Sequence, residues 1–265
     1  MARISVLMGI YNCAPYLQEA LDSLYAQTYQ DFKIILCDDG SKDETYAIAQ
    51  TNAEEHDNIV LIRNEKNMGL NYTLNHCLEY ADTEYCARMD GDDISLPTRF
   101  ETEIKFLDEH PEYAIVSCPM IYFDENGEFG RGKVGGEPKK EDFIYGSPHC
   151  HAPCMVRTKA YQTVEGYTVS QKLLRVEDYH LWIKMYALGY RGYNLSECLY
   201  AMRDNREAVK RRTWKGSINN MRVHLLACRQ LKLPLKGYIY SFMPIIKRLL
   251  PRPLYIFLHK NRLGK

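Results

Sequence analysis

The stretch FKIILCDDGSKDE, residues 32–44, joins a continuous apolar run to a polar turn. Because the apolar residues do not alternate with polar ones, the run predicts a strand buried on both faces, as strands of a parallel sheet are. The acids, glycine and serine that follow are typical of a turn into a helix, with Ser41 or Asp43 as the candidate N-cap. The stretch therefore predicts one strand–turn–helix unit.

The same unit recurs through the first half of the chain. Four more apolar runs predict strands at residues 4–10, 59–62, 84–89 and 113–118. Between the strands, apolar residues recur at helical spacing over 17–24, 70–81 and 100–107. This alternation predicts an α/β fold with a mostly parallel, Rossmann-like sheet flanked by helices. Ligands of such sheets bind beyond the carboxyl ends of the strands, so the polar clusters at 11–15, 38–44 and 90–93 are expected on one rim.

The second half of the chain is less regular. Residues 120–150 are rich in glycine and predict a loop-like flap or insertion, and 154–161 predict a further strand and turn. A helix is expected from Glu177 to about Gly189, and a longer one over 205–232. We therefore expect a domain over 1–203 and a helical, basic extension over 204–265.

Charge is distributed unevenly along a chain whose formal net charge is zero. Residues 203–265 hold 16 basic and two acidic residues, a net of +14, so residues 1–202 carry −14. The basic segment suits a polyanion, either a membrane surface or nucleic acid, and the acidic body disfavours nucleic acid because it would repel the phosphates. The alternative is a helical appendage that packs on the domain and exposes a solvated basic face.

The compartment is suggested by the cysteines and by the apolar segments. Nine scattered cysteines, and an N-terminus that does not look like a signal peptide, favour a reducing cytoplasm. No stretch approaches 18 uninterrupted apolar residues, so no membrane-spanning helix is predicted.

Three carboxylates cluster in CARMDGDDISLP, residues 86–97: Asp90, Asp92 and Asp93. A D-x-D pair at a strand end can hold Mg²⁺ or Mn²⁺ through one or two carboxylates and leave other positions for water and phosphate oxygens. The alternative is a solvated acidic turn that complements the dipole of the helix after Pro97. Arg88, in the same strand, is a candidate partner for one of the acids.

Two later motifs also carry chemistry. In RVEDYHLW (175–182), Glu177 and Asp178 occupy the first turn of an amphipathic helix, where they either complement the helix dipole or supply a general base. HCHAPC (149–154) suggests a structural zinc site, but no second ligand pair stands elsewhere in the sequence. A histidine that lines a pocket is the favoured interpretation, with His151 as the candidate.

Taken in order, five motifs resemble the family 2 glycosyltransferases, the inverting enzymes of the nucleotide-diphospho-sugar A-type fold. They are SVLMGIYN (5–12), Q-T-Y-x-D-F-K-I-I-L-C-D-D-G-S-x-D (27–43), N-x-G-L (67–70), R-M-D-G-D-D-I-S-L-P-x-R (88–99) and E-D-Y-x-L-W (177–182). The resemblance covers about residues 3–203. It implies the A-type fold and transfer of a sugar from a nucleotide diphosphate.

The resemblance also implies roles for individual residues. Tyr11 and Asp39 match the nucleobase-binding positions. Asp90 is placed near the ribose, with Arg88 assigned to the same nucleotide-sugar site, and Asp92 is the main ligand of Mn²⁺ or Mg²⁺. Asp178 matches the catalytic base, and Glu177 precedes it as a supporting acid. Asp93, Asn67 and His151 are further candidates.

The implied reaction is a direct displacement in which Asp178 takes the proton of an acceptor hydroxyl. The implied donor is a nucleotide-diphosphate sugar, preferably a UDP-sugar, and the acceptor is a glycan or a polyprenyl-diphosphate-linked sugar in cell-surface polysaccharide synthesis. The basic tail resembles those of bacterial capsule and O-antigen transferases, which implies a cytoplasmic protein held peripherally on the anionic inner face of the plasma membrane. No Q-x-x-R-W motif is present, which favours one sugar per encounter.

Two other classes of protein are compatible with single features of the sequence. A nucleotidyltransferase of related fold would need a glycine-rich, cationic loop after the first strand, and GIYNCAPY (9–16) holds one glycine and no cation. A membrane-associated binding protein without catalysis would need only the basic tail.

Overall fold

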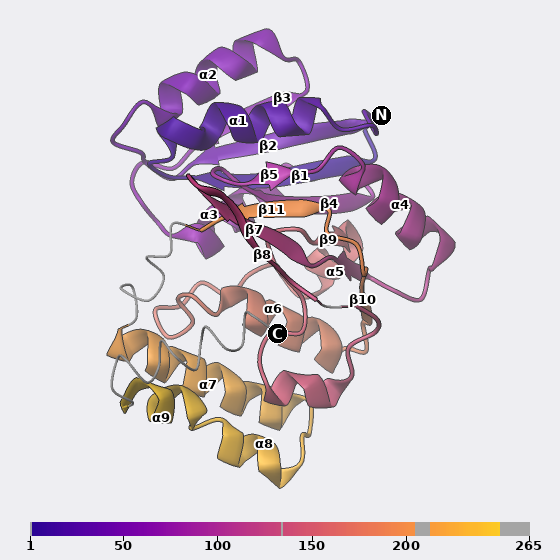
Figure 1. Ribbon diagram of the computed structural model, residues 1–265, viewed down its shortest axis with the longest axis vertical. Helices are drawn as coiled ribbons and strands as arrows, with labels where there is room; N and C mark the ends of the chain where they lie inside the picture. The colour runs from indigo at the N-terminus through magenta and orange to yellow at the C-terminus, as the bar shows by residue number, and fades with distance from the viewer. Residues whose placement is uncertain (1, 134, 205–212, 250–265) are drawn as a thin grey trace.

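A seven-stranded sheet organises the computed structural model, which describes residues 2–133, 135–204 and 213–249 (Figure 1). Its strand order is β10-β6-β9-β4-β1-β2-β3. Neighbouring strands run parallel except at β9, which is antiparallel to both β4 and β6. The predicted, mostly parallel sheet is therefore confirmed. The strands are β1 (Ile4–Ile10), β2 (Phe32–Asp38), β3 (Ile59–Arg63), β4 (Tyr85–Asp90), β6 (Ile115–Ser117), β9 (Met155–Arg157) and β10 (Gly192–Asn194).

Strand register brings the polar clusters to one edge of this sheet. In β1, Ile10 pairs with Asp38 of β2, and Gly9 pairs with Asp90 of β4. The carboxyl ends of these three central strands therefore coincide. The predicted rim is confirmed, because Tyr11, Asp39 and the acids after β4 all follow directly from these ends.

Helices cover both faces of the sheet, which explains why the strands are continuously apolar. Leu7 of β1 belongs to the core on one face, while Val6 and Met8 belong to the core on the other. Helices α1 and α4 contribute to the second core, and α3 and α6 to the first. The helices of this part are α1 (Ala14–Tyr25), α2 (Thr45–Glu55), α3 (Leu70–Leu78), α4 (Arg99–Glu109), α5 (Thr158–Thr163) and α6 (Glu177–Ala187).

The prediction of a loop over residues 120–150 is wrong. β7 (Met120–Asp124) and β8 (Gly127–Arg131) form a hairpin, and a 3₁₀ helix, η1, covers Lys140–Ile144. The hairpin belongs to a second sheet of order β5-β11-β7-β8, with β5 at Ile94–Ser95 and β11 at Tyr200–Arg203. Its partner β11 lies far along the chain, and the glycines of β8 hide the strand pattern. The turn predicted after β9 is likewise the start of helix α5.

The predicted N-cap of α2 is also wrong. The helix begins at Thr45, so Glu44 occupies the cap position. Ser41 Oγ instead accepts a hydrogen bond from the backbone N–H of Asn12. Asp43 accepts from the N–H groups of Thr45 and Ala14, and so ties this turn to the start of α1.

Three helices form the C-terminal part of the described chain: α7 (Trp214–Gln230), α8 (Leu235–Tyr240) and α9 (Met243–Leu249). Of the helix predicted over 205–232, residues 205–212 lie outside the described residues. Thr213 caps α7 by accepting from Gly216 N–H. The buried residues of α7 and those of α6 belong to the same hydrophobic core. Figure 1 shows the two helices packed against each other. The extension thus packs on α6, the helix that covers one face of the large sheet, and the boundary at residue 203 stays a prediction.

Candidate functional site

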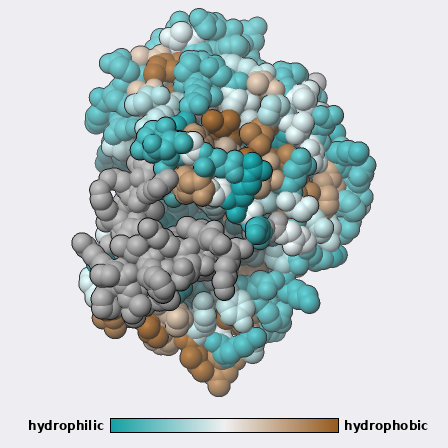
Figure 2. All heavy atoms as spheres, in the orientation of Figure 1, coloured by the Kyte–Doolittle hydropathy of each residue, from teal (hydrophilic) through white to brown (hydrophobic). Residues whose placement is uncertain are grey.

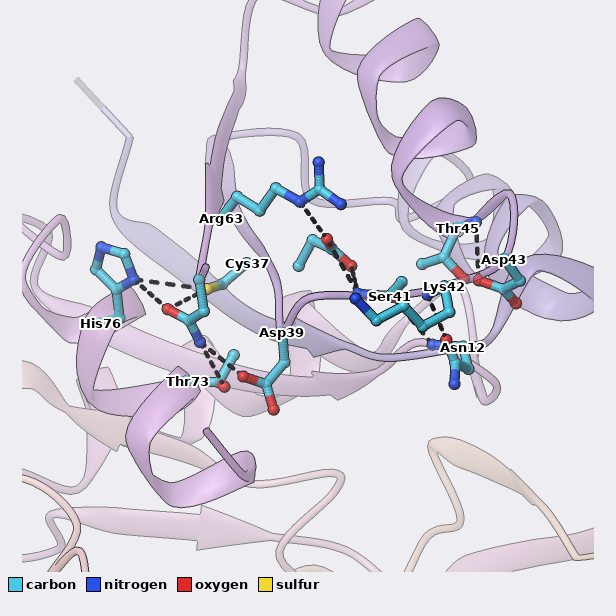
Figure 3. A network of polar contacts seen from close by, with 12 residues as sticks. Asn12, Cys37, Asp39, Ser41, Lys42, Asp43, Thr45, Arg63, Thr73 and His76 are labelled. Atoms are coloured by element: carbon cyan, nitrogen blue, oxygen red, sulfur yellow. Dashed lines mark hydrogen bonds and ion pairs between the residues drawn. The ribbon is translucent and has the colours of Figure 1, made fainter. Parts of the chain in front are cut away.

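Asp39, directly after β2, is fixed by three hydrogen bonds. Figure 3 shows its side chain within the network of polar contacts at this edge of the sheet. Its Oδ1 accepts from Asn64 Nδ2 and from the Met68 backbone N–H, both at 2.8 Å, and its Oδ2 accepts from Gly69 N–H at 2.9 Å. The side chain is buried. Asp39 therefore holds the loop before α3 against the sheet and presents a preorganised carboxylate at the rim.

Two other candidate residues of the nucleotide site have side chains that are exposed to solvent. Tyr11, directly after β1, is 45% exposed, and Asn67, in the loop that Asp39 holds, is exposed. The adjacent acid has a different task, because Asp38 is buried and pairs with Arg63 Nε at 2.9 Å. The sequence motif does not distinguish Asp38 from Asp39. In the structure, Asp39 binds the loop before α3, whereas Asp38 pairs with Arg63.

Arg88 pairs with Asp90, as the sequence suggests. Arg88 lies inside the sheet and is 3% exposed, while Asp90 ends β4 at the surface of the rim. Burial opposes the charge of Arg88, but the Asp90 carboxylate outweighs it and raises the pKa of the guanidinium above its ordinary value. A permanent buried cation therefore lies directly behind the D-x-D motif.

Burial, and then like charge, disfavour the ionised forms of the other two acids of the cluster. Burial raises the pKa of Asp92, and the neighbouring Asp90 raises it further, although Arg88 partly offsets this. Burial likewise raises the pKa of Asp93 to about 8, with Asp90 and Asp92 adding to the effect. Within the described part of the chain, no group of three or more His, Cys, Asp or Glu side chains is arranged to hold a metal ion.

Arg203 is the residue of this site that the sequence reasoning missed. Its backbone N–H donates to Asp93 Oδ1 at 2.8 Å, and its Nε donates to the Asp92 carbonyl at 3.0 Å. The guanidinium lies 4.5 Å from the ring centroids of both Tyr16 and Phe123. Asp93 is therefore held by the Arg203 backbone, while Arg88 pairs with Asp90. β11 pairs with β5, which brings Arg203 beside the acidic loop, and no local signal reveals that contact.

Asp178 lies in the first turn of α6 and shares a neighbour with the D-x-D motif. Burial raises the pKa of Asp178 to about 6, and the adjacent Glu177 carboxylate contributes in the same direction. The charge of Arg88 acts on Asp178 in the opposite sense. Arg88 therefore links Asp90 and Asp178 electrostatically. Asp178 also lines a cavity of about 460 Å³.

His151 belongs to the same surroundings, and His149 does not. His151 Nε2 lies 2.7 Å from the Tyr167 hydroxyl, and burial together with the charge of Arg88 lowers the pKa of His151. His149 instead lies 2.8 Å from Asn194 and 3.0 Å from the Tyr186 hydroxyl. The two histidines thus have separate hydrogen-bond partners, although both rings contact Trp182. His151 is not among the described residues that line the cavity beside Asp178, so its interpretation as a pocket-lining residue stays a prediction.

Solved structures with the same arrangement of strands and helices are glycosyltransferases. The fold matches residues 1–349 of S. aureus TarS in complex with UDP at a TM-score of 0.69 and 21% identity, over 92% of this chain and 69% of that one. It also matches the mannosyltransferase PcManGT from Pyrobaculum calidifontis, in complex with GDP-Man and Mn²⁺, at a TM-score of 0.65 and 18% identity, over 98% and 79% of the two chains. The fold is therefore the A-type glycosyltransferase fold that the sequence motifs imply.

The sequence comparisons give the family. The model of glycosyl transferase family 2 matches residues 5–164. EpsE of Bacillus subtilis, which carries a provisional glycosyltransferase name, is 42% identical over 98% of this chain and 94% of its own. The amylovoran biosynthesis glycosyltransferase AmsE of Erwinia amylovora is 32% identical over 98% and 99%. The chain belongs to glycosyl transferase family 2, and its activity is that of a glycosyltransferase.

One further relative has a name that specifies its substrates. The Escherichia coli UDP-Gal:alpha-D-GlcNAc-diphosphoundecaprenol beta-1,3-galactosyltransferase is 29% identical over 98% of this chain and 96% of its own.

Proposed function

We propose that this enzyme transfers one sugar from a UDP-sugar to a hydroxyl of a sugar linked to a polyprenyl diphosphate, with inversion at the anomeric carbon, in cell-surface polysaccharide synthesis. One observation carries the proposal: Asp178, whose pKa is about 6, shares the buried Arg88 with Asp90 of the D-x-D motif. The E. coli relative that uses UDP-Gal and a diphosphoundecaprenol acceptor supports this choice of substrates.

The donor is assigned to the rim of the large sheet. Tyr11 is exposed directly after β1, and the Asp39 carboxylate directly follows the neighbouring end of β2, a combination that suits a nucleobase ring and one of its N–H groups. Asn67 stands in the loop that Asp39 orders. Asp90, paired with Arg88, is assigned to the ribose. These roles follow the family motif.

A divalent cation fits the acids after β4. Asp90 and Asp92 are oxygen ligands of the kind that Mg²⁺ and Mn²⁺ prefer. Burial, and then the charge of Asp90, raise the pKa of Asp92, and a bound cation would offset both effects. We assign Asp92 as the main ligand and Asp93 as a support held by the Arg203 backbone. Mn²⁺ or Mg²⁺ bound there would neutralise the charge of the leaving diphosphate.

In the proposed reaction, Asp178 removes the proton from the acceptor hydroxyl as that oxygen attacks the anomeric carbon. The new carbon–oxygen bond forms on the face opposite the diphosphate, whose bond to carbon breaks and takes the electron pair with it. A carboxylate with a pKa near 6 is ionised at neutral pH, yet is a stronger base than an ordinary aspartate.

A donor screen tests this function. The purified protein is incubated with UDP-Glc, UDP-Gal, UDP-GlcNAc, UDP-GalNAc or UDP-GlcA, with Mn²⁺ or Mg²⁺ or with EDTA, and UDP release is measured. We expect one donor to be turned over with metal, with acceleration by GlcNAc-diphosphate-farnesol, and a strong loss in EDTA. Release of pyrophosphate from UTP and a sugar 1-phosphate, without UDP release from any donor, would assign the nucleotidyltransferase reaction instead.

The C-terminal helices carry a surface that suits an anionic bilayer. Five apolar side chains of α8, of α9 and of the turn between them are exposed, each by 48% or more, and we call them the apolar stripe: Leu235, Ile239, Phe242, Ile246 and Leu249. Figure 2 shows hydrophobic side chains gathered at the end of the molecule formed by α8 and α9. Lys236, Lys247 and Arg248 lie on the same helices, and each basic residue near an anionic surface contributes about 1 kcal/mol.

We assign this apolar stripe to the inner face of the plasma membrane, where a polyprenyl-linked acceptor lies, and we place the enzyme in the cytoplasm. In the described residues, no helix has the length and hydropathy needed to cross a bilayer. The assigned contact is therefore peripheral, through side chains that enter the headgroup region.

Glutamates in the apolar stripe are expected to weaken membrane binding. The double variant Leu235→Glu, Ile239→Glu should bind vesicles with 30% phosphatidylglycerol at least about tenfold more weakly, because it loses two apolar insertions and adds repulsion. Leu188→Glu is the matched control, since Leu188 is 60% exposed at the end of α6. Vesicle flotation measures the effect. Equal flotation of the double variant and the control, or undiminished flotation with neutral vesicles, would contradict the assignment.

A further inference from the structure

Asn64, directly after β3, is a buried amide in contact with Asp39. Its Nδ2 donates to Asp39 Oδ1 at 2.8 Å and to Thr73 Oγ1 at 3.0 Å, and its Oδ1 lies 2.9 Å from His76 Nδ1. Figure 3 shows these contacts around the labelled Asp39, Thr73 and His76. Asn64 therefore connects the carboxylate at the rim with two side chains of α3.

The groups around Asn64 fix the orientation of its amide. The Asp39 carboxylate only accepts hydrogen bonds, so the donating nitrogen of Asn64 must face it. The amide oxygen therefore faces His76, and because that oxygen only accepts, His76 Nδ1 must carry a hydrogen and donate it. The Cys37 thiol is a second, weaker donor to the same oxygen, at 3.9 Å. His76 thus holds Asn64 in the orientation that donates to Asp39.

The contacts of Asp39 leave it little capacity to accept further hydrogen bonds. Oδ1 accepts from Asn64 Nδ2 and from Met68 N–H, whereas Oδ2 accepts from Gly69 N–H. A carboxylate has about four acceptor positions, two on each oxygen, so the described residues leave one open, on Oδ2. The loop also packs tightly on the turn after Asp39, because a Cβ atom added to Gly40 would lie 2.7 Å from the loop's backbone.

One open acceptor position suits a base that offers a single N–H. Uracil presents N3–H between two carbonyl groups, so one carboxylate oxygen is enough. Guanine presents two neighbouring donors, N1–H and N2–H, and a carboxylate binds both only when each of its oxygens has an open position. Cytosine and adenine present a ring nitrogen that accepts hydrogen bonds, which the carboxylate would repel. The contacts of Asp39 therefore favour uracil.

We propose that Asn64 is a positioning residue that makes the nucleotide site selective for a base with a single N–H. Asn64 fills a position on Asp39 Oδ1 that guanine would need, and it fixes the carboxylate so that Oδ2 accepts uracil N3–H. His76 acts through Asn64 by holding its amide. The inference rests on the assignment of Asp39 to the nucleobase in the proposed function, and it adds the two residues that set the choice of base.

Calorimetric binding of nucleotides tests the proposal. The ligands are UDP, GDP and the 3-methyluridine analogue of UDP, which lacks the N3–H. All are measured at the same Mn²⁺ concentration, so that the contribution of the diphosphate cancels in the affinity ratios. The parent should bind UDP at least about tenfold more tightly than either other ligand, as expected for one hydrogen bond to a charged group. Asn64→Ala should reduce both ratios at least about fivefold, because the carboxylate loses one of its fixed contacts.

His76→Phe tests the same network from its other end. The variant keeps a ring at a half-buried position but removes the donor to Asn64, so both ratios should fall about threefold. His76→Phe decides the question if Asn64→Ala does not fold. Asn58→Ala is the matched control at the opposite end of β3, where Asn58 makes a 3.4 Å contact with the Phe32 carbonyl, and it should keep the parent ratios.

A steady-state measurement separates positioning from a purely structural role. With the UDP-sugar as substrate, Asn64→Ala should raise KM at least about fivefold and leave kcat within about twofold, because the base does not take part in the reaction. A loss of stability alone lowers the melting temperature without changing the preference among bases. Ratios that stay at the parent values in both Asn64→Ala and His76→Phe would overturn the proposal, and so would a parent that binds GDP as tightly as UDP.

The outcomes distinguish this inference from the proposed function. Normal turnover of a UDP-sugar, with base ratios that do not change in either variant, leaves the function in place and removes the role of Asn64. Conversely, ratios that depend on Asn64 and His76, in a protein that turns over no UDP-sugar, support the base selectivity and remove the proposed function.

Discussion

Replacement of Asp178 by Asn is expected to lower kcat for sugar transfer by about 10³-fold, since a general base contributes roughly 10² to 10⁴. The amide keeps the size of the side chain but cannot take the proton of the acceptor hydroxyl. UDP affinity in the presence of Mn²⁺ should stay within about twofold, because Asp178 lies on α6 and not on the nucleotide rim. Steady-state kinetics and UDP titration measure the two quantities. Asp57→Asn, an exposed change at the amino end of β3, is the control.

The pH dependence gives a second test of the same residue. Asp178 must be ionised to act as a base, so kcat/KM should rise with pH through about 6 and level off above it. Glu177→Gln removes a neighbouring negative charge that raises the pKa of Asp178. This variant should therefore shift the acid limb toward lower pH. A limb that stays in place in Glu177→Gln, or full transfer by Asp178→Asn, would show that another group is the base.

Replacement of Asp92 by Ala is expected to lower transfer by 10³-fold or more at saturating Mn²⁺. The change removes the assigned main ligand, and electrostatic stabilisation of a leaving group supplies several kcal/mol of the barrier reduction. UDP affinity should also lose its dependence on Mn²⁺, because the diphosphate binds through the cation. The measurements are transfer rates over a Mn²⁺ titration and calorimetric binding of UDP with and without Mn²⁺.

The control for Asp92→Ala is Asp57→Ala, which removes an exposed carboxylate at the opposite end of the sheet. Asp57→Ala should keep the transfer rate and the Mn²⁺ requirement of the parent enzyme. Metal-dependent transfer by Asp92→Ala at the parent rate would refute the assignment, and so would undiminished activity of the parent in EDTA.

Much of the large sheet follows from local patterns. The runs over 4–10 and 32–37 predict buried strands because every residue in them is compatible with one of two covered faces, and the structure places alternate residues in two cores. Helix α6 is predicted from Glu177 because its apolar residues repeat at helical spacing, and it ends at Ala187, close to Gly189 with φ of +88°. The shared rim follows from parallel strands of matched register.

The second sheet and the wall of the cavity do not follow from local patterns. β11 pairs with β7 and also with β5, and its pairing with β5 brings Arg203 to the Asp92 carbonyl. The segment over 120–150 lacks apolar alternation in its glycine-rich part, so nothing local marks it as a hairpin. Arg175 and Lys247 lie far apart along the chain and line one cavity only because α7 packs on α6 and α9 packs on α7.

By itself, therefore, the sequence determined the fold class, the shared edge at which the central strands end, and the acidic residues of the candidate site. Only the tertiary structure decided that Arg88 is buried and pairs with Asp90, that Arg203 holds the acidic loop, and that the C-terminal helices complete a cavity beside Asp178. The reason is physical. Burial of one face of a helix or strand produces a regular spacing of apolar residues that is visible in the local sequence. A contact between distant segments depends on how whole elements pack, so it produces no such spacing.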